Sequence, residues 1–290
     1  FYEQRPLPYA EAGYGYPESG QTVVDVTNGK LIRLLVDDTP FDVRYGVLQS
    51  HERTLDFRTG VLHRRADWIS PAGAEVLVES RRLVSYVQRS IAAIEYVVSA
   101  KDKPIRIVLQ SELVANESQP VLTSDPRKAA ALDRPLEPIS HDVDGHGVVL
   151  LHRTRNSNLM MAAGMSHLIE TSARHQIDVD VREEWARVTV ICSLEPGQSL
   201  RLVKFVGYGW SALRSETAIR DQVAAALDAA MFYGWDGLLA EQKQRLDDFW
   251  DAADVSIEGN DALQQAIRFA LFHIFQAGVR AERRAIPSKG

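Results

Sequence analysis

Cysteine is nearly absent from this sequence, because Cys192 is the only one among 290 residues. One cysteine cannot form an intramolecular disulfide, so nothing requires an oxidising compartment and we expect a cytoplasmic protein. Cys192 alternates with Val188, Val190 and Leu194 in an apolar-rich run. Such a position is typical of a small core residue and not of a catalytic thiol.

Excess positive charge and long apolar runs are also missing. The formal net charge is −6 at pH 7, whereas nucleic-acid-binding domains usually display a strongly basic face. The most apolar stretch, residues 83–100, is interrupted by Gln88, Arg89 and Glu95, so no segment is predicted to span a membrane. We therefore expect no nucleic-acid partner, no membrane partner and a neutral small molecule as ligand.

An initiator methionine and an apolar signal segment are absent from the start of the chain, Phe1-Tyr2-Glu3-Gln4. We interpret this start as a truncated or processed N-terminus. It carries no information about secretion, so the cytoplasmic assignment rests on cysteine content.

Several motifs for catalysis or cofactor binding are missing as well. The segment Gly13-Tyr14-Gly15-Tyr16-Pro17 fits neither the phosphate-loop nor the dinucleotide-binding pattern. There is no G-x-S-x-G motif, and Ser166 and His167 are merely adjacent. Residues 141–146 hold two histidines and two aspartates, but this spacing matches no zinc site and favours a polar turn. We expect neither a metal nor a cofactor.

What the sequence does contain, between residues 22 and 114, is a series of short apolar-rich segments separated by turn signals, which indicates β-strands. Asn28-Gly29 lies between the apolar segments 22–26 and 31–36 and predicts a tight hairpin, because Asn-Gly readily adopts positive φ. Further turns are predicted at residues 38–40, 59–60, 71–73, 102–104 and 195–197. The spacing is typical of an antiparallel β-sandwich.

Residues 115–146 lose this periodicity and gain four prolines, which predicts a long loop that serves an interface, a function or neither. Strands are predicted again from residue 147 to about 206, and residues 177–181 alternate strictly between apolar and polar.

Glu183 and Glu184 follow these strands and are candidate catalytic carboxylates. Paired carboxylates suit glycoside hydrolysis, but a hairpin tip favours a solvated turn. Tyr9, Tyr14 and Tyr16 suit sugar stacking or, in their proline- and glycine-rich context, packing.

After Trp210 the apolar period changes to that of helices. Ser215 is the predicted N-cap of a helix that runs to Phe232, and a second helix covers residues 235–252. Asp261 is predicted to cap a third helix. Its apolar side chains, Phe272 among them, occupy several faces, so we expect an exposed patch and interpret the chain as ending inside a larger helical domain.

Six segments, taken in order, carry a resemblance to a known family. They are RTLDFRTGVL (53–62) followed by Trp68 and Pro71, SRRLVS (80–85), DFW (248–250), DVSI (254–257), QQAIRF (264–269) and IPSKG (286–290). Together they resemble glycoside hydrolase family 65, which contains maltose, trehalose and kojibiose phosphorylases and acid trehalases. The resemblance covers essentially the whole chain.

The resemblance implies a mainly β fold: an antiparallel β-sandwich, or supersandwich, in residues 1–210, a helical linker in 211–256 and the first helix of a truncated (α/α)6 barrel in 257–290. It also implies a parent enzyme that breaks an α-glucosidic bond with inversion, using phosphate or water, in disaccharides such as trehalose, maltose or kojibiose. Inorganic phosphate would then be a co-substrate, and a homodimer is expected.

The family's catalytic residues are expected beyond Gly290, so the resemblance assigns none within this chain. Lys289 is the one candidate for proximity to the substrate, with a structural loop lysine as the alternative. We expect the chain alone to be inactive. The competing hypothesis is a non-catalytic carbohydrate-binding or dimerisation module, which the incomplete helical domain argues against.

Overall fold

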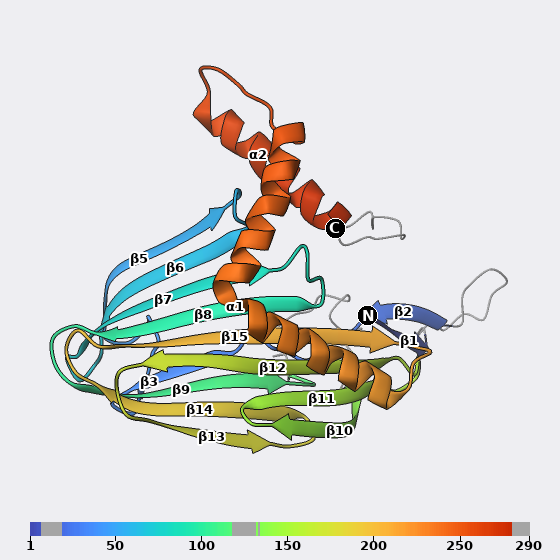
Figure 1. The fold of residues 1–290 in the computed structure, drawn as a ribbon, viewed down its shortest axis with the longest axis horizontal. Helices are drawn as coiled ribbons and strands as arrows, with labels where there is room; N and C mark the ends of the chain where they lie inside the picture. The colour runs from blue at the N-terminus through green and yellow to red at the C-terminus, as the bar shows by residue number, and fades with distance from the viewer. Residues whose placement is uncertain (7–18, 118–131, 133, 280–290) are drawn as a thin grey trace.

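The computed structural model describes residues 1–6, 19–117, 132 and 134–279 as an antiparallel β-sandwich followed by two helices (Figure 1). The eight-stranded sheet has the order β10-β11-β12-β15-β8-β7-β6-β5. Its strands are β5 (Val47–Asp56), β6 (Val61–Ile69), β7 (Glu75–Val84), β8 (Ile91–Ala100), β10 (Leu136–Asp144), β11 (Gly147–Thr154), β12 (Met160–Thr171) and β15 (Ser199–Ser211). The predicted mainly β fold is confirmed.

A five-stranded sheet of order β13-β14-β9-β3-β4 packs against the first sheet. Its strands are β3 (Ile32–Val36), β4 (Thr39–Pro40), β9 (Ile105–Val114), β13 (His175–Val181) and β14 (Trp185–Leu194). A separate pair is formed by β1 (Tyr2–Pro6) and β2 (Ser19–Val23). Inward-facing side chains of both sheets form the core, including Trp68, Val98 and Leu109. Cys192 is buried there as predicted, and burial raises the pKa of its thiol to about 11.

The predicted Asn28-Gly29 hairpin is wrong. Asn28 instead forms an isolated antiparallel bridge with Val114, and β3 pairs with β9. The structure explains Gly29 by close packing, because a Cβ there would lie 2.6 Å from Val206 Cγ1 and 2.7 Å from the Tyr208 hydroxyl oxygen. A glycine required by tertiary contact therefore resembled a turn signal.

The predicted loop at residues 115–146 is also shorter than expected, since β10 begins at Leu136. β10 is an edge strand, and its register shifts between Pro138 and Ser140. A proline at a sheet edge costs little because its missing N–H can face away from the ladder. The turns predicted at residues 59–60, 71–73, 102–104 and 195–197 do lie between strands, whereas the turn predicted at 38–40 is displaced to residues 37–38 because Thr39–Pro40 form β4.

Helix α1 (Glu216–Ala253) contains the first two predicted helices, joined at Gly234, whose φ of 65° and ψ of −177° are not helical. Ser215 accepts a hydrogen bond from the Ala218 N–H, which confirms it as the N-cap. In α2 (Asp261–Val279) the predicted cap is displaced by one residue, because the Asn260 side chain accepts the Leu263 N–H at 3.0 Å.

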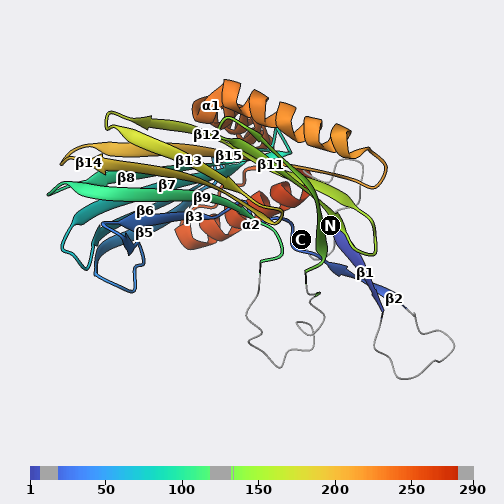
Figure 2. The same cartoon turned by 90° about the horizontal axis from the view of Figure 1, so that it is seen from below.

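The first half of α1 lies on the outer face of the large sheet, over β12 and β15 (Figure 2). Ile219, Val223 and Leu227 are buried in this contact. Glycines 164, 207 and 209 of the two strands make the close approach possible, because a Cβ at each would lie within 3.3 Å of a helix side chain. The helix runs from there towards the β5–β6 hairpin, where α2 joins it.

Candidate functional site

The tip of the β5–β6 hairpin is a tight turn among the helices. The Asp56 carboxylate accepts the Arg58 N–H (2.9 Å) and the Thr59 hydroxyl (2.7 Å). Its carbonyl accepts the N–H of Gly60, which has a φ of 65° that favours glycine. Both carboxylate oxygens of Asp56 thus accept hydrogen bonds within the turn. The carbonyls of Phe57 and Thr59 remain available to donors outside the turn.

The second half of α1 binds these two carbonyls. Gln242 Nε2 donates to the Thr59 carbonyl at 2.9 Å, and Trp250 Nε1 donates to the Phe57 carbonyl at 2.8 Å. Gln242 is fully buried and Trp250 is 9% exposed. Because hydrogen bonds are directional, they fix the orientation of the helix against the turn as well as its distance.

Helix α2 packs on the same turn through aromatic rings. The Phe57 ring centroid lies 5.3 Å from that of Phe272 and 5.9 Å from that of Phe269. Phe272 is fully buried, so the expectation that it belongs to an exposed patch is wrong, and the reason is that Phe57 covers it. Phe269 (48%) and Ile274 (64%) do remain exposed.

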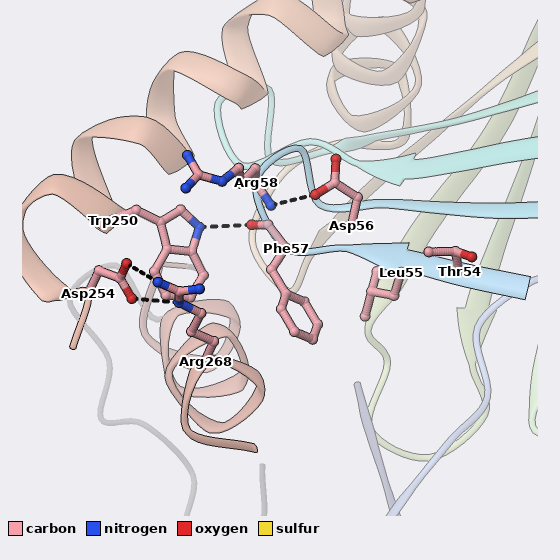
Figure 3. Close-up of a pocket in the computed structure, with 8 residues that line it drawn as sticks. All are labelled: Thr54, Leu55, Asp56, Phe57, Arg58, Trp250, Asp254 and Arg268. Atoms are coloured by element: carbon pink, nitrogen blue, oxygen red, sulfur yellow. Dashed lines mark hydrogen bonds and ion pairs between the residues drawn. The ribbon is translucent and has the colours of Figure 1, made fainter. Parts of the chain in front are cut away.

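A shallow pocket of about 390 Å³ lies where the turn meets the two helices (Figure 3). Residues 54–58, Trp250, Asp254 and Arg268 line it. Arg268 donates to both oxygens of Asp254, at 2.8 and 2.7 Å. These hydrogen bonds lower the pKa of Asp254, which therefore stays an ionised acceptor.

Aromatic and ionic walls suit binding of a polar ring, but the pocket holds no proton donor suited to glycoside cleavage. A general-acid carboxyl needs a raised pKa to keep its proton near neutral pH. The pKa of Asp254 is lowered instead of raised, and both carboxylate oxygens of Asp56 accept hydrogen bonds within the turn. The geometry supports positioning and binding, and it offers no acid for bond cleavage.

Two further carboxylates inside the fold are structural. Burial opposes ionisation of Glu95, but hydrogen bonds from Arg81 and Arg201 outweigh it, and the pKa is lowered. Glu112 follows the same pattern between Arg33 and Arg187, each at 2.8 Å. Arginine pairs hold both carboxylates as anions on the outer faces of the sheets.

The sheet interface contains a buried polar layer that sequence reasoning missed. His167 Nε2 lies 2.8 Å from Ser111 Oγ, and burial lowers the pKa of the imidazole to about 3. Lys204 is fully buried and donates to the carbonyls of Leu31 (3.2 Å) and Glu112 (2.7 Å). Burial lowers the pKa of this lysine to about 7. Ser166 takes no part in the His167 contact, so the Ser166-His167 dipeptide forms no catalytic pair.

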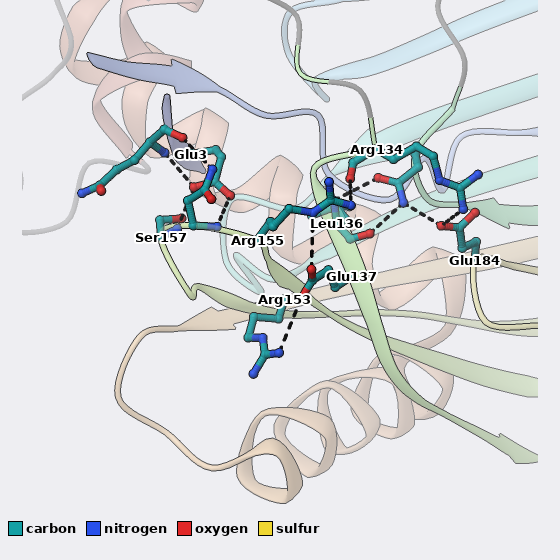
Figure 4. Close-up of polar contacts among 11 residues, drawn as sticks. Glu3, Arg134, Leu136, Glu137, Arg153, Arg155, Ser157 and Glu184 are labelled. Carbon is teal, nitrogen blue, oxygen red and sulfur yellow. Dashed lines mark hydrogen bonds and ion pairs between the residues drawn. The ribbon is translucent and has the colours of Figure 1, made fainter. Parts of the chain in front are cut away.

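A third polar cluster ties β1 to the sandwich (Figure 4). The buried Glu3 carboxylate accepts the backbone N–H groups of Asn156 (2.8 Å) and Ser157 (2.6 Å). Glu184, predicted at a hairpin tip, lies between β13 and β14 and accepts from Asn116 (2.9 Å) and Arg134 (2.6 Å). Its role is to hold neighbouring segments together.

The remaining predicted site residues divide into two groups. His141, Asp142 and Asp144 lie in β10 and His146 in the tight turn to β11, where the His146 carbonyl lies 3.3 Å from His167 Nδ1. Within residues 1–6, 19–117, 132 and 134–279, no three potential metal ligands cluster. Tyr9, Tyr14, Tyr16 and Lys289 lie outside the described residues.

Neither of the two helices in the described ranges is long and apolar enough to cross a membrane.

Comparison with known proteins gives consistent relatives. Residues 1–249 match the profile of the N-terminal domain of glycosyl hydrolase family 65. An uncharacterised glycosyl hydrolase of Mycobacterium tuberculosis is 62% identical over 290 residues, which is 100% of this chain and 37% of that protein. The α,α-trehalose phosphorylase of Thermoanaerobacter brockii is 31% identical over 291 residues, covering 100% of this chain and 38% of that protein.

Among solved structures, a putative kojibiose phosphorylase from the human microbiome superposes with a TM-score of 0.83 at 19% identity. The match covers 95% of this chain and 35% of that structure, and it shows that the fold is shared. The chain spans little more than a third of the length of these relatives. The chain belongs to glycosyl hydrolase family 65, through that family's N-terminal domain.

Proposed function

We propose that this chain is the N-terminal part of an enzyme that breaks α-linked glucose disaccharides with inversion, with phosphate or water attacking the anomeric carbon. One observation carries the proposal: alignment over the full chain with α,α-trehalose phosphorylases of two bacteria, at 31% and 26% identity. Nigerose and kojibiose phosphorylases align at 20% and 24% identity. Trehalose is therefore the first substrate to test, and inorganic phosphate the first co-substrate.

Within this proposal the sandwich and the helices have a positioning role. The β5–β6 turn holds α1 by two side-chain-to-carbonyl hydrogen bonds and α2 by aromatic packing. We propose that α2 is the first helix of the helical domain that carries the chemistry, and that residues 211–256 are the linker to it. The lowered pKa of Asp254 supports a proton donor elsewhere.

The test is release of glucose or glucose 1-phosphate from trehalose, kojibiose, nigerose and maltose, each with and without phosphate. The 290-residue chain is compared with the full-length protein. We expect phosphate-dependent release from trehalose by the full-length protein and none by the chain. Release by the chain that persists after repurification would overturn the positioning role. If the full-length protein released no product from any of these disaccharides, the enzymatic proposal would be overturned.

The pocket at the turn favours a second candidate, a carbohydrate-binding role. Phe57 and Trp250 provide aromatic surface beside the Asp254–Arg268 pair, and this combination can bind a sugar ring. Titration of the chain with each disaccharide, followed by tryptophan fluorescence, tests it. Saturable binding that Arg268→Gln abolishes supports the candidate, whereas equal responses of the variant and the native chain would refute it.

A further inference from the structure

Three arginines lie together on the inner face of the large sheet, on the strands at its β5 edge. Arg53 of β5 stands directly opposite Arg64 of β6 in the antiparallel register. Arg82 of β7 pairs with Leu62, two residues from Arg64 along β6 and on the same face. Side chains directly opposite on paired strands have Cβ atoms about 4.5–5.5 Å apart, and diagonal neighbours about 7–8 Å. The three guanidinium groups therefore occupy one small area.

The second sheet does not cover the part of the inner face where the three arginines lie. The five-stranded sheet ends at the two-residue strand β4, and β5 is exposed along its whole length except at Leu55. Further along the same inner face, Trp68 and Val78 are covered and buried. The arginines thus lie where the sandwich core opens to solvent, accessible to a ligand yet partly screened from water.

No acidic partner neutralises these arginines in the part of the chain that the structure describes. The neighbouring acids Glu52 and Glu79 belong to the opposite face of their strands, and Glu79 pairs there with Arg65 at 2.8 Å. Arg64 Nε donates to His51 Nε2 at 3.0 Å, and this contact brings no carboxylate to the three arginines. Like charges directly opposite each other in a sheet are destabilising.

A tyrosine hydroxyl beside the arginines provides a second, independent observation. Tyr96 of β8 pairs with Ser80 of β7, which lies two residues from Arg82 on the same inner face. The Tyr96 residue is 7% exposed. Among the described residues its hydroxyl has no hydrogen-bond partner, and Arg64 and Arg82 are the charges that face it. A phenol hydroxyl without a protein partner beside two cations can donate a hydrogen bond to an anion that binds there. Arg82 shows the same strain: burial, together with Arg64 and Arg53, lowers its pKa.

We propose that Arg53, Arg64, Arg82 and Tyr96 form a binding site for a phosphate group, either free or as a phosphomonoester. Guanidinium forks match phosphate oxygens in bidentate geometry, and the phenol donates one further hydrogen bond. A phosphate group carries about −1.5 to −2 charges at pH 7 on three or more oxygens. A single carboxylate brings one charge and two oxygens, which fits three forks and a hydroxyl less well.

This site is independent of the proposed function, because it uses residues of the sandwich alone. Binding is measured by titration calorimetry of the 290-residue chain with inorganic phosphate and, separately, with a hexose monophosphate. Sodium chloride at matched ionic strength controls for screening. Tighter binding of the monoester assigns the site to phosphomonoesters, and equal or weaker binding assigns it to free phosphate. Absence of saturable binding of both overturns the proposal.

The variants are Arg64→Gln, Arg82→Gln and Tyr96→Phe, with Arg65→Gln as the matched control on the opposite face. We expect each arginine variant to weaken binding about tenfold or more, and Tyr96→Phe to weaken it less, since hydrogen bonds of charged groups exceed those of neutral ones. Loss of binding in Arg65→Gln equal to that in Arg64→Gln would overturn the site as nonspecific attraction.

Thermal unfolding separates a ligand site from a structural role. Without ligand, Arg53→Gln should unfold at a higher temperature than the native chain, because it removes repulsion from Arg64 and Arg82. Phosphate should raise the unfolding temperature of the native chain and much less that of the variant. A lower unfolding temperature of ligand-free Arg53→Gln, with an undiminished response to phosphate, would overturn the proposal.

Discussion

The two halves of α1 are attached to the sandwich in different ways. The first half lies on the glycine-bearing face of β12 and β15, and its contacts are apolar side chains fitted to backbone. The second half is held at the β5–β6 turn, where Gln242 and Trp250 each donate to a backbone carbonyl. The first attachment depends on volume and the second on hydrogen-bond geometry, so different substitutions should separate them.

Phe272→Glu should have the largest effect, and it should act at the β5–β6 turn, where α2 packs beside the second attachment. The substitution removes a fully buried ring that packs on Phe57 and places a charge there. Loss of the ring alone costs about 3–5 kcal/mol, and an unpaired buried charge adds to it. We expect α2 to detach while the sandwich stays folded.

Hydrogen exchange measures this outcome segment by segment. Protection should fall in α2 and stay in β9, whereas the exposed Ile274→Glu control should leave both unchanged. Simultaneous loss of protection in β9 would show that the sandwich and the helices at the turn unfold as one cooperative unit, and the comparison would fail.

Gly164→Val should break the first attachment. A Cβ at Gly164 would lie 2.7 Å from Leu227 Cδ1 and 3.0 Å from Val223 Cγ1. Overpacking costs about 1–3 kcal/mol, and we expect the upper end because the helix backbone must move. Urea denaturation measures the loss. Leu227→Ala in the same chain should recover part of it, and strictly additive losses would contradict the proposed contact.

Whether the sequence reveals one of these features depends on how far apart in the chain the interacting residues lie. Local signals succeeded: Ser215 caps α1, and the glycine at position 234 separates the two predicted helices. The failures involve distant partners. Gly29 is required by its close approach to Val206, and Phe272 is covered by Phe57. No periodicity within a single segment encodes such contacts.

The arginine site shows the same limit. The sequence places residues 53, 64 and 82 at spacings with no motif, and only the strand register brings them to one face. Glu184 illustrates the converse, because its position in a turn was predictable while its partners Asn116 and Arg134 were not. Side-chain clusters across strands require the register, which one sequence does not provide.

Acid should weaken the sandwich before it affects the turn. Burial lowers the pKa of His167 to about 3 from an ordinary 6.5, so between these values the unfolded chain binds a proton that the folded chain does not. The contribution of His167 to stability is fully present above pH 6.5 and falls as the pH is lowered below it. Burial also lowers the pKa of His152.

From pH 6.5 to 5.0 the loss due to His167 should be about 2 kcal/mol, since one pH unit corresponds to about 1.4 kcal/mol, and His152 should add to it in the same direction. Urea denaturation of the native chain and of His167→Gln measures it in a range where carboxyl groups scarcely titrate. The variant should show a shallower pH dependence. Identical slopes would mean that His167 becomes protonated in the folded chain.

Trp250→Phe should have the smallest effect, and it isolates one hydrogen bond of the second attachment. The substitution removes the indole N–H that donates to the Phe57 carbonyl at 2.8 Å and leaves that carbonyl without this donor. Trp235→Phe is the matched control on the same helix, because its buried indole nitrogen has no hydrogen-bond partner among the described residues. Both substitutions remove a similar volume, and Trp235→Phe also weakens the contact with the Arg81 guanidinium at 5.0 Å, so their difference is a lower limit for the bond. We expect Trp250→Phe to cost about 1 kcal/mol more than Trp235→Phe in urea denaturation. Equal costs would mean that the Trp250 hydrogen bond adds no stability and that packing and the Gln242 hydrogen bond hold the second half of α1.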